Sequence, residues 1–331
     1  MSKIIILATG GTIACVQTDK GYVPGLTGQQ LVQQIPQLSE MGEVQARQLM
    51  NIDSSDMRIS DWRTIARAVY NESDYFDGVV ITHGTDTMCY TAAALSFMLS
   101  NLKIPVVLTG AQMPLTIADS DGPRNVLAAV AVAQSGVPGV QVVFNNKIIN
   151  GSRAFKMYAK NSDAYVSRNF PYLGSVLPDF TIDRQATAKV LRNERPLITN
   201  LCEDVILLKI TPATSPSILD HIAREGYRGV VIEGFGTGGI ANLNRGMLDG
   251  IRYLTDNLQV PVVMISQCPY DGVNLAVYGV GEQASSVGVI PGNDMTTETA
   301  VVKLMWALGL SNDLATIREL MLTNFCDEIT V

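Results

Sequence analysis

The sequence predicts an α/β protein with two domains, the larger at the N-terminus and the smaller at the C-terminus. A chain of 331 residues is longer than chains that usually fold around a single hydrophobic core, so two domains are expected. Short β-branched runs alternate with helix-like patterns, which is typical of a mostly parallel sheet covered on both faces. The alternation resumes in the second half, and we expect a second parallel sheet there.

In the first half, four short apolar runs end at glycine or polar residues and predict buried strands over 4–8, 78–82, 104–109 and 140–145. A helix is predicted where Trp62, Ile65, Ala66 and Val69 recur at helical spacing, with Ser60 as its N-cap. Residues 91–99 and 125–133 predict largely buried helices.

In the second half, strands are predicted over 205–210, 229–233 and 260–265, and helices over 216–224, 246–257, 296–308 and 312–322. The stretch 184–204 between the halves is the most polar and least patterned part of the chain. We therefore expect an N-terminal domain over 1–187, a linker over 188–204 and a C-terminal domain over 205–331.

Composition restricts the class of protein. Apolar residues make up 47% and charged residues 17%, so a large core is expected and disorder is not. No apolar stretch approaches the ~20 residues of a membrane span, and the first apolar run is too short for a signal peptide. Five scattered cysteines without a CxxC favour reduced thiols and a cytoplasmic location. A net charge of −7 without a basic cluster argues against nucleic-acid and membrane partners.

Three predicted strands of the first half end in similar chemistry. They end at Thr9-Gly10-Gly11-Thr12, Thr82-His83-Gly84-Thr85-Asp86 and Thr109-Gly110-Ala111-Gln112. Each motif pairs a glycine, which lets a backbone approach a ligand, with hydroxyl or carboxylate side chains. Ligands of parallel sheets bind beyond the carboxyl ends of the strands, so the three motifs together predict a binding cleft.

Several chemistries fit the sequence poorly. His83 and His221 are the only histidines and lie in different halves, which argues against a metal site. A triad through His83 lacks an obvious nucleophile, and a buried imidazole bonded to the backbone is the simpler interpretation. A phosphate loop of the GxxxxGK[ST] type is absent. Gly234 to Gly239 match GxGxxG after a strand, but Asn242 and Asn244 delay the next helix, so a dinucleotide site is weakly indicated.

Once these chemistries are set aside, a threonine acting as the nucleophile is the remaining hypothesis for the predicted cleft. A hydroxyl is a weak nucleophile at its free pKa and needs a nearby base. Without histidine, the candidates are a desolvated lysine or a tyrosine acting with a carboxylate. Lys156 follows the fourth predicted strand and is a candidate, although an isolated lysine is usually an ordinary surface residue.

The motifs ATGGTIA (8–14) and ITHGTDTM (81–88) together resemble the two signatures of the bacterial-type L-asparaginase family. The resemblance continues through NIDSSDM (51–57), VVLTGAQMP (106–114), SDGPRN (120–125), VFNNKIINGSRAFK (143–156), GVVIEGFGTGGI (229–240) and GVIPGNDMTTETAVVKLMWALG (288–309). Nearly the whole chain is therefore covered, and without a secretory segment it looks like the cytosolic type I branch.

The resemblance implies two α/β domains, no cofactor, no metal, and hydrolysis of L-asparagine to L-aspartate and ammonia, with minor glutaminase activity. It implies Thr12 as the nucleophile, assisted by Tyr22, and a second unit of Thr85, Asp86 and Lys156, in which Thr85 positions or activates the attacking water. Asparagine would be held by Gly11, Asp53, Ser54, Ser55, Thr85, Asp86 and Ala111. The N–H groups of Thr12 and Ala111 are expected at the developing oxyanion.

Other expectations concern the flanking residues and the assembly. Asp53 and Asp56 flank the two serines and either bind substrate or shape the turn, and Asp121 is expected to cap a helix. The family forms homodimers or homotetramers that share sites, and Asn242 and Asp271 are rough matches for the residues that a neighbouring subunit supplies.

Two other classes stay open. The amidase subunit of an archaeal glutamyl-tRNA amidotransferase uses the same catalytic module, but it carries an extra N-terminal domain, whereas here the first strand begins at residue 4. A non-catalytic amino-acid-binding protein would keep Asp86 and the serines but lose Thr12 or Lys156, and all of these residues are present.

Overall fold

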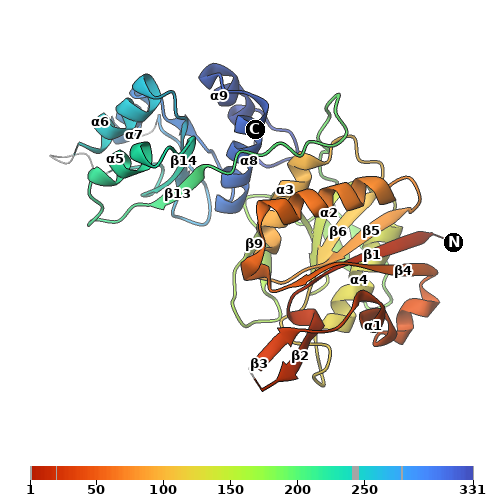
Figure 1. The fold of residues 1–331 in the computed structure, drawn as a ribbon. Coiled ribbons are helices and arrows are strands. Elements are labelled where there is room, and N and C mark those ends of the chain that lie inside the picture. Colours follow the sequence, from red (N-terminus) through yellow and green to blue (C-terminus); the bar gives the residue numbers. More distant parts are fainter. Residues whose placement is uncertain (1, 20, 241–245, 277–278, 331) are drawn as a thin grey trace. The chain divides into compact units, whose positions relative to one another are not determined.

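The computed structural model describes residues 2–19, 21–240, 246–276 and 279–330. The chain forms two compact α/β units (Figure 1). The first contains the residues up to Thr199 together with Phe325–Asp327, and the second contains Asn200–Asn324 and the residues from Glu328 on. The predicted fold class, with a larger N-terminal and a smaller C-terminal sheet domain, is confirmed.

The first unit contains an eight-stranded sheet in the order β12-β11-β8-β7-β6-β5-β1-β4. Its strands are β1 (Lys3–Gly10), β4 (Glu43–Ile52), β5 (Gly78–Thr82), β6 (Pro105–Thr109), β7 (Gly139–Phe144), β8 (Lys147–Asn150), β11 (Gly174–Val176) and β12 (Ile182–Arg184). The strands from β7 to β4 are parallel, and β8, β11 and β12 extend them in antiparallel order. The carboxyl ends of β1, β4, β5 and β6 therefore meet at one edge.

Helices cover both faces of this sheet, as Figure 1 shows. They are α1 (Gly28–Gln33), α2 (Ile59–Glu72), α3 (Met88–Met98) and α4 (Gly122–Gln134), with one-turn helices at Thr12–Ala14, Pro36–Glu40 and Ser54–Asp56. On one face, Ile4 and Ile6 of β1 and Val80 of β5 share a core with the apolar residues of α4. On the other face, α3 packs on β6 and β7, and α2 packs on α3.

Two hairpins accompany this sheet. One pairs β2 (Cys15–Thr18) with β3 (Gly21–Pro24), and Figure 1 shows it projecting from the unit. The other pairs β9 (Ala154–Lys156) with β10 (Tyr165–Ser167). All five cysteines are free thiols.

The predicted N-cap of α2 is wrong. Arg58 is the N-cap residue, and the Asp61 carboxylate accepts a hydrogen bond of 2.8 Å from the Arg58 amide. Ser60 lies inside the helix, because the carboxylate of the third helical residue already satisfies the amide at the cap.

The second unit contains a four-stranded parallel sheet in the order β13-β14-β15-β16. Its elements are β13 (Val205–Lys209), α5 (Ser217–Arg224), β14 (Gly229–Gly234), α6 (Met247–Arg252), a π-helical turn (Tyr253–Asn257), β15 (Val262–Ser266), α7 (Gly279–Ser286), β16 (Ile290–Pro291), α8 (Thr297–Leu310) and α9 (Leu314–Leu322). The core on one face joins Val230 and Ile232 of β14 to apolar residues of α5 and α6. Helix α8 packs on β13, β14 and β15, and α9 packs on α8.

Glycines let the strand ends of the first unit stack directly on one another. A Cβ at Gly10 would lie 2.6 Å from the backbone of Ile52, and one at Gly11 would lie 2.3 Å from the backbone of Gly84. A Cβ at Gly84 would lie 2.6 Å from the Ser54 side chain, and one at Gly110 would lie 2.3 Å from the carbonyl oxygen of His83. The first role of these glycines is therefore contact between backbone segments, which brings Thr12, Ser54 and Thr85 to neighbouring loops.

Gly11→Ala is expected to lower the free energy of unfolding by about 2–3 kcal/mol. Gly11 has φ 77° and ψ −178°, a backbone conformation that only glycine adopts readily, and the added methyl group would meet Gly84. Gly136→Ala is the matched control, because Gly136 has φ +69° and open space around an added Cβ. Urea unfolding of both variants tests this, and equal losses would contradict the close-packing argument.

Candidate active site

Thr12 begins the one-turn helix that follows β1. It is half-buried, and Gly11 is the N-cap of that helix. The hairpin β2–β3 starts three residues later and carries Tyr22, which is 49% exposed and pairs with Gln17. No hydrogen bond joins the side chains of Thr12 and Tyr22 among the described residues. The structure thus places Thr12 at the sheet edge and Tyr22 on a projecting hairpin.

Thr85, Asp86 and Lys156 form a hydrogen-bonded unit. The Lys156 ammonium lies 2.8 Å from the Thr85 hydroxyl oxygen and 2.5 Å from the Asp86 carboxylate. Thr85 is buried, and the side chain of Lys156 is only 16% exposed, whereas that of Asp86 is 66% exposed. Lys156 comes from the end of β9, 70 residues beyond Asp86 in the chain. The sequence grouping of these three residues therefore corresponds to a spatial cluster.

Tyr165 supports this unit from β10, although it belongs to none of the sequence motifs. It pairs with Lys156 across the hairpin β9–β10, and its hydroxyl donates a hydrogen bond to the carbonyl oxygen of Thr85. Its buried ring packs on Phe144 at 4.8 Å between ring centroids. Tyr165 thereby fixes the backbone of Thr85 relative to the strand that carries Lys156.

The turn after β4 contains Asp53, Ser54 and Ser55. The Asp53 carboxylate accepts hydrogen bonds from the Ser55 amide at 2.9 Å and the Ser55 hydroxyl at 2.6 Å, and these bonds lower the pKa of Asp53. Ser54 is buried, and its hydroxyl accepts a hydrogen bond of 3.2 Å from the Asp86 amide. The turn is thus joined to the Thr85–Asp86 loop, and Asp53 shapes it.

Ala111 is fully buried in the loop after β6, and Asp121 holds this loop. The expected capping role of Asp121 is wrong in one respect. Asp121 occupies the N-cap position of α4, but its carboxylate accepts hydrogen bonds of 3.0 Å each from the amides of Gln112 and Met113. The Ser120 hydroxyl instead accepts the bond from the Gly122 amide. A carboxylate next to two free amides gains more there than at a helix end that a serine already serves.

His83 lies directly before these residues but is fully buried, with both ring nitrogens occupied. Its Nδ1 lies 2.7 Å from the Gly84 carbonyl oxygen, and its Nε2 lies 2.9 Å from the Thr91 hydroxyl. The Gly84 carbonyl oxygen can only accept, so the neutral imidazole donates from Nδ1 and its Nε2 accepts from the Thr91 hydroxyl, which in turn accepts from the Trp62 indole. This geometry supports the interpretation of His83 as a buried imidazole that is bonded to the backbone. It does not support a catalytic triad, because neither ring nitrogen faces a candidate nucleophile of the site.

The burial of His83 predicts a pH dependence of stability. Burial lowers the pKa of His83 to about 4, whereas the unfolded imidazole has the ordinary value near 6.5. Below about pH 6.5 the unfolded chain binds the proton more tightly, so the free energy of unfolding falls by about 3 kcal/mol as the pH drops to about 4. His83→Asn is expected to remove this slope, as measured by urea unfolding between these pH values.

His221→Gln is the control for that experiment, because His221 is the other histidine of the chain and is exposed on α5. It should leave the slope between pH 4 and 6.5 as in the unaltered protein. A slope that survives His83→Asn would mean that carboxylates alone cause the pH dependence.

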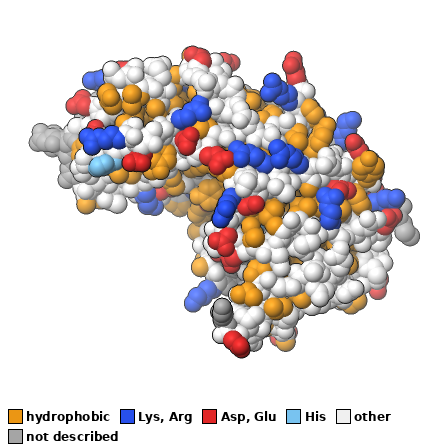
Figure 2. Space-filling view, viewed as in Figure 1, with side chains coloured by type: hydrophobic (Ala, Val, Ile, Leu, Met, Phe, Trp, Pro, Cys, Tyr) orange, Lys and Arg blue, Asp and Glu red, His pale blue; other side chains and the backbone are white. Residues whose placement is uncertain are grey.

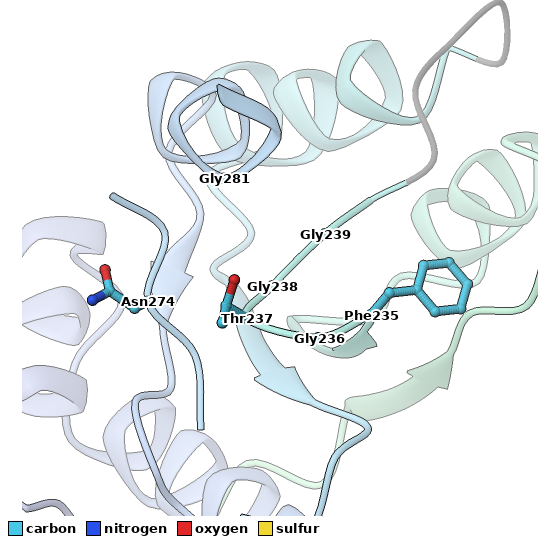
Figure 3. A pocket seen from close by; sticks show the side chains of 7 residues that line it. All are labelled: Phe235, Gly236, Thr237, Gly238, Gly239, Asn274 and Gly281. Atoms are coloured by element: carbon cyan, nitrogen blue, oxygen red, sulfur yellow. The ribbon is translucent and has the colours of Figure 1, made fainter. Parts of the chain in front are cut away.

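The second-half candidates lie elsewhere in the chain. Asn242 lies outside the described residues. Asp271 is exposed in the loop after β15 and has φ 73°. The glycine-rich turn after β14 lines a cavity of about 210 Å³ together with Asn274 and Gly281 (Figure 3). Helix α6 begins at Met247, eight residues past Gly239, whereas the helix of a dinucleotide site begins at the glycine turn itself. The turn therefore does not match that motif.

The distribution of charged and metal-binding side chains bears on whether the part of the chain that the structure describes holds a second site. On the face in Figure 2, acidic and basic side chains are interspersed rather than gathered by sign. Within the described ranges, no cluster of three or more His, Cys, Asp or Glu is arranged to hold a metal ion. No helix in the same ranges has both the length and the apolar character to span a membrane.

The fold and the site together define a class of α/β protein. In this class, hydroxyl side chains on two loops lie beside a Thr–Lys–Asp unit at the carboxyl ends of the strands. Residues 3–188 match the family described as Asparaginase, N-terminal, and residues 204–321 match the Glutaminase/Asparaginase C-terminal domain. The chain belongs to the asparaginase family.

Individual relatives agree with this family. The L-asparaginase of Thermococcus kodakarensis is 42% identical over 330 residues, covering 99% of both chains. A glutamyl-tRNA(Gln) amidotransferase subunit of Pyrococcus abyssi is 39% identical, and the match covers all of this chain and 77% of that protein.

Solved structures are also similar. The thermostable L-asparaginase from Thermococcus kodakarensis has a TM-score of 0.94 and 40% identity, with 99% of both chains covered. The probable cytoplasmic L-asparaginase from Campylobacter jejuni has a TM-score of 0.82 and 30% identity, with 98% of this chain and 100% of that chain covered.

Proposed function

We propose that this protein hydrolyses L-asparagine to L-aspartate and ammonia through an acyl-enzyme on Thr12. The Thr85–Lys156–Asp86 unit carries the proposal. The Lys156 ammonium lies 2.8 Å from the Thr85 hydroxyl oxygen and 2.5 Å from the Asp86 carboxylate. Thr85 and Asp86 follow Gly84, whose backbone packs closely against Gly11, the residue before Thr12. A family membership alone would fit a binding protein as well, but such a protein has no need of a lysine held against a buried hydroxyl.

In the proposed reaction the Thr12 oxygen attacks the side-chain amide carbon, the bond from that carbon to nitrogen breaks, and the hydroxyl proton of Thr12 ends on the nitrogen, which leaves as ammonia. The N–H groups of Thr12 and Ala111 bind the oxyanion, and Tyr22 assists when its hairpin covers the substrate. Water then attacks the acyl carbon from the side of Thr85. The bond from that carbon to Thr12 breaks, and a proton of the water ends on the Thr12 oxygen.

The substrate is proposed to bind by its charged α-groups. The Asp86 carboxylate pairs with the ammonium group, and Ser54 and Ser55 hold the α-amino and α-carboxylate groups, with Gly11 lining the site. The bonds from Ser55 to Asp53 fix the orientation of the Ser55 hydroxyl. Asn242 and Asp271 of a neighbouring subunit are proposed to complete the site in a homodimer or homotetramer, which light scattering can test.

Ammonia release from L-asparagine and L-glutamine by the purified protein tests the function. One methylene separates the two amides, which is worth about 1–3 kcal/mol, so asparagine should be preferred by about 10- to 200-fold in kcat/KM. Turnover of the free amino acid without tRNA would also separate this activity from that of an amidotransferase subunit. If neither amide releases ammonia although L-asparagine binds, the protein is a binding protein instead.

A further inference from the structure

Gln112 connects the Thr85–Lys156–Asp86 unit to the turn of the hairpin β9–β10. Its Oε1 lies 3.1 Å from the Thr85 hydroxyl oxygen. Its Nε2 lies 3.5 Å from the carbonyl oxygen of Tyr158 and 3.2 Å from those of Ala159 and Asn161. Gln112 is half-buried, and Asp121 holds its backbone amide at 3.0 Å.

The surroundings of the Gln112 amide decide which of its ends faces Thr85. Three carbonyl oxygens, which can only accept hydrogen bonds, surround one end of the group. Only an NH₂ group satisfies them, so the carbonyl end must face Thr85. An amide oxygen only accepts, and the single proton of the Thr85 hydroxyl is therefore donated to Gln112.

This direction fixes the other two positions around the Thr85 oxygen. A hydroxyl has one donor and two acceptor lone pairs. With its proton on Gln112, Thr85 accepts from Lys156, whose ammonium lies 2.8 Å away. One lone pair remains, and it can accept a hydrogen bond from a further group.

We propose that Gln112 is a positioning residue that holds Thr85 as a hydrogen-bond acceptor for the water that hydrolyses the acyl-enzyme. The inference rests on the proposed function. In this step the water oxygen forms a bond to the acyl carbon, the carbon–oxygen bond to Thr12 breaks, and a water proton ends on Thr12. Thr85 neither gains nor loses a proton, and its lone pair orients the water that attacks.

The inference separates the two halves of the reaction. Without the acceptor at position 112, the Thr85 proton turns toward the water and the lone pair is no longer presented to it. Release of ammonia precedes the entry of water and is spared. Hydrolysis of the acyl-enzyme should slow by about 10- to 100-fold, because misplacement of a reacting group has effects of this size.

Gln112→Met tests this, because methionine has a similar length and no strong acceptor. Rapid-quench measurements should show a burst of about one ammonia per site, no burst of aspartate, and a slow steady state that hydroxylamine accelerates. Hydroxylamine is a stronger nucleophile than water and needs less orientation. An unchanged steady state would overturn the inference, as would ammonia and aspartate falling together without a burst.

Gln112→Glu separates this role from simple anchoring of the hairpin turn. Glutamate keeps an acceptor for Thr85 but loses the donors to the three carbonyl oxygens. A positioning role predicts faster steady-state turnover in Gln112→Glu than in Gln112→Met, whereas an anchoring role predicts the reverse. If the unaltered protein releases no ammonia, the proposed function fails. If it is active and the variants give the reverse order, only this inference fails.

Discussion

Thr12→Ala is expected to lower kcat for ammonia release from L-asparagine by about a thousandfold or more. The variant removes the oxygen that attacks the amide carbon and then carries the acyl group, while Lys156 and Asp86 stay in place. Binding of asparagine should persist, because the ammonium and carboxylate contacts lie on other loops. Steady-state ammonia release and calorimetric binding of L-asparagine measure the two effects.

Thr12→Ser is the control for this variant, because it keeps a hydroxyl on Cβ and loses only the methyl group. It should retain much more activity than Thr12→Ala and form the same acyl-enzyme, which hydroxylamine traps. Residual turnover in Thr12→Ala close to that of the unaltered protein would mean that another group, such as Thr85, carries the acyl chain.

Glu328→Ala is expected to destabilise the second unit by about 3–5 kcal/mol. Lys303 of α8 is fully buried, and its ammonium lies 2.6 Å from the Glu328 carboxylate. The ammonium also donates hydrogen bonds to the carbonyl oxygens of Met321 at 3.0 Å and Thr323 at 2.7 Å. Removing the carboxylate leaves a buried charge without its counter-ion, and urea unfolding measures the cost.

Two further variants show whether the charge is the cause. Lys303→Met combined with Glu328→Leu removes both charges and should recover most of the lost stability, because an apolar replacement of a buried pair is often neutral. Glu43→Ala breaks the exposed pair with Lys3, which spans 3.6 Å, and should cost less than about 1 kcal/mol. Equal losses in Glu43→Ala and Glu328→Ala would contradict the role of burial.

The sequence predicted the central strands of both sheets because those strands consist mostly of apolar, buried residues. β1, β5, β6, β7, β14 and β15 start or end within two residues of their predicted bounds. The edge strand β4 was not predicted, because it contains half-buried and exposed residues rather than an apolar run. Its pairing with β1 defines it as a strand, and its composition does not. The antiparallel strands β8, β11 and β12 are only three or four residues long, which is too short for a recognisable pattern.

The residues that bear the proposed chemistry were found by motif, but their supports were not. Asp86 and Lys156 are 70 residues apart, and Tyr165 reaches Thr85 across 80 residues. Asp121 binds backbone amides, and Gln112 binds backbone carbonyl oxygens as well as the Thr85 hydroxyl. Every sequence contains such backbone groups, so no side-chain pattern reveals these contacts. Such supports become visible only once the strands and loops are placed.

Three residues of the first unit, Phe325–Asp327, come from near the C-terminal end of the chain. The carbonyl oxygen of Cys326 accepts bonds from Asn150 at 2.9 Å and Ser152 at 3.0 Å, and the carbonyl oxygen of Asp327 accepts one from Arg153 at 2.5 Å. These partners immediately precede the strand that ends at Lys156. A ribosome translates residues 325–327 after nearly all of the second unit. The segment before Lys156 therefore cannot form these hydrogen bonds during synthesis until nearly all of the second unit has been translated.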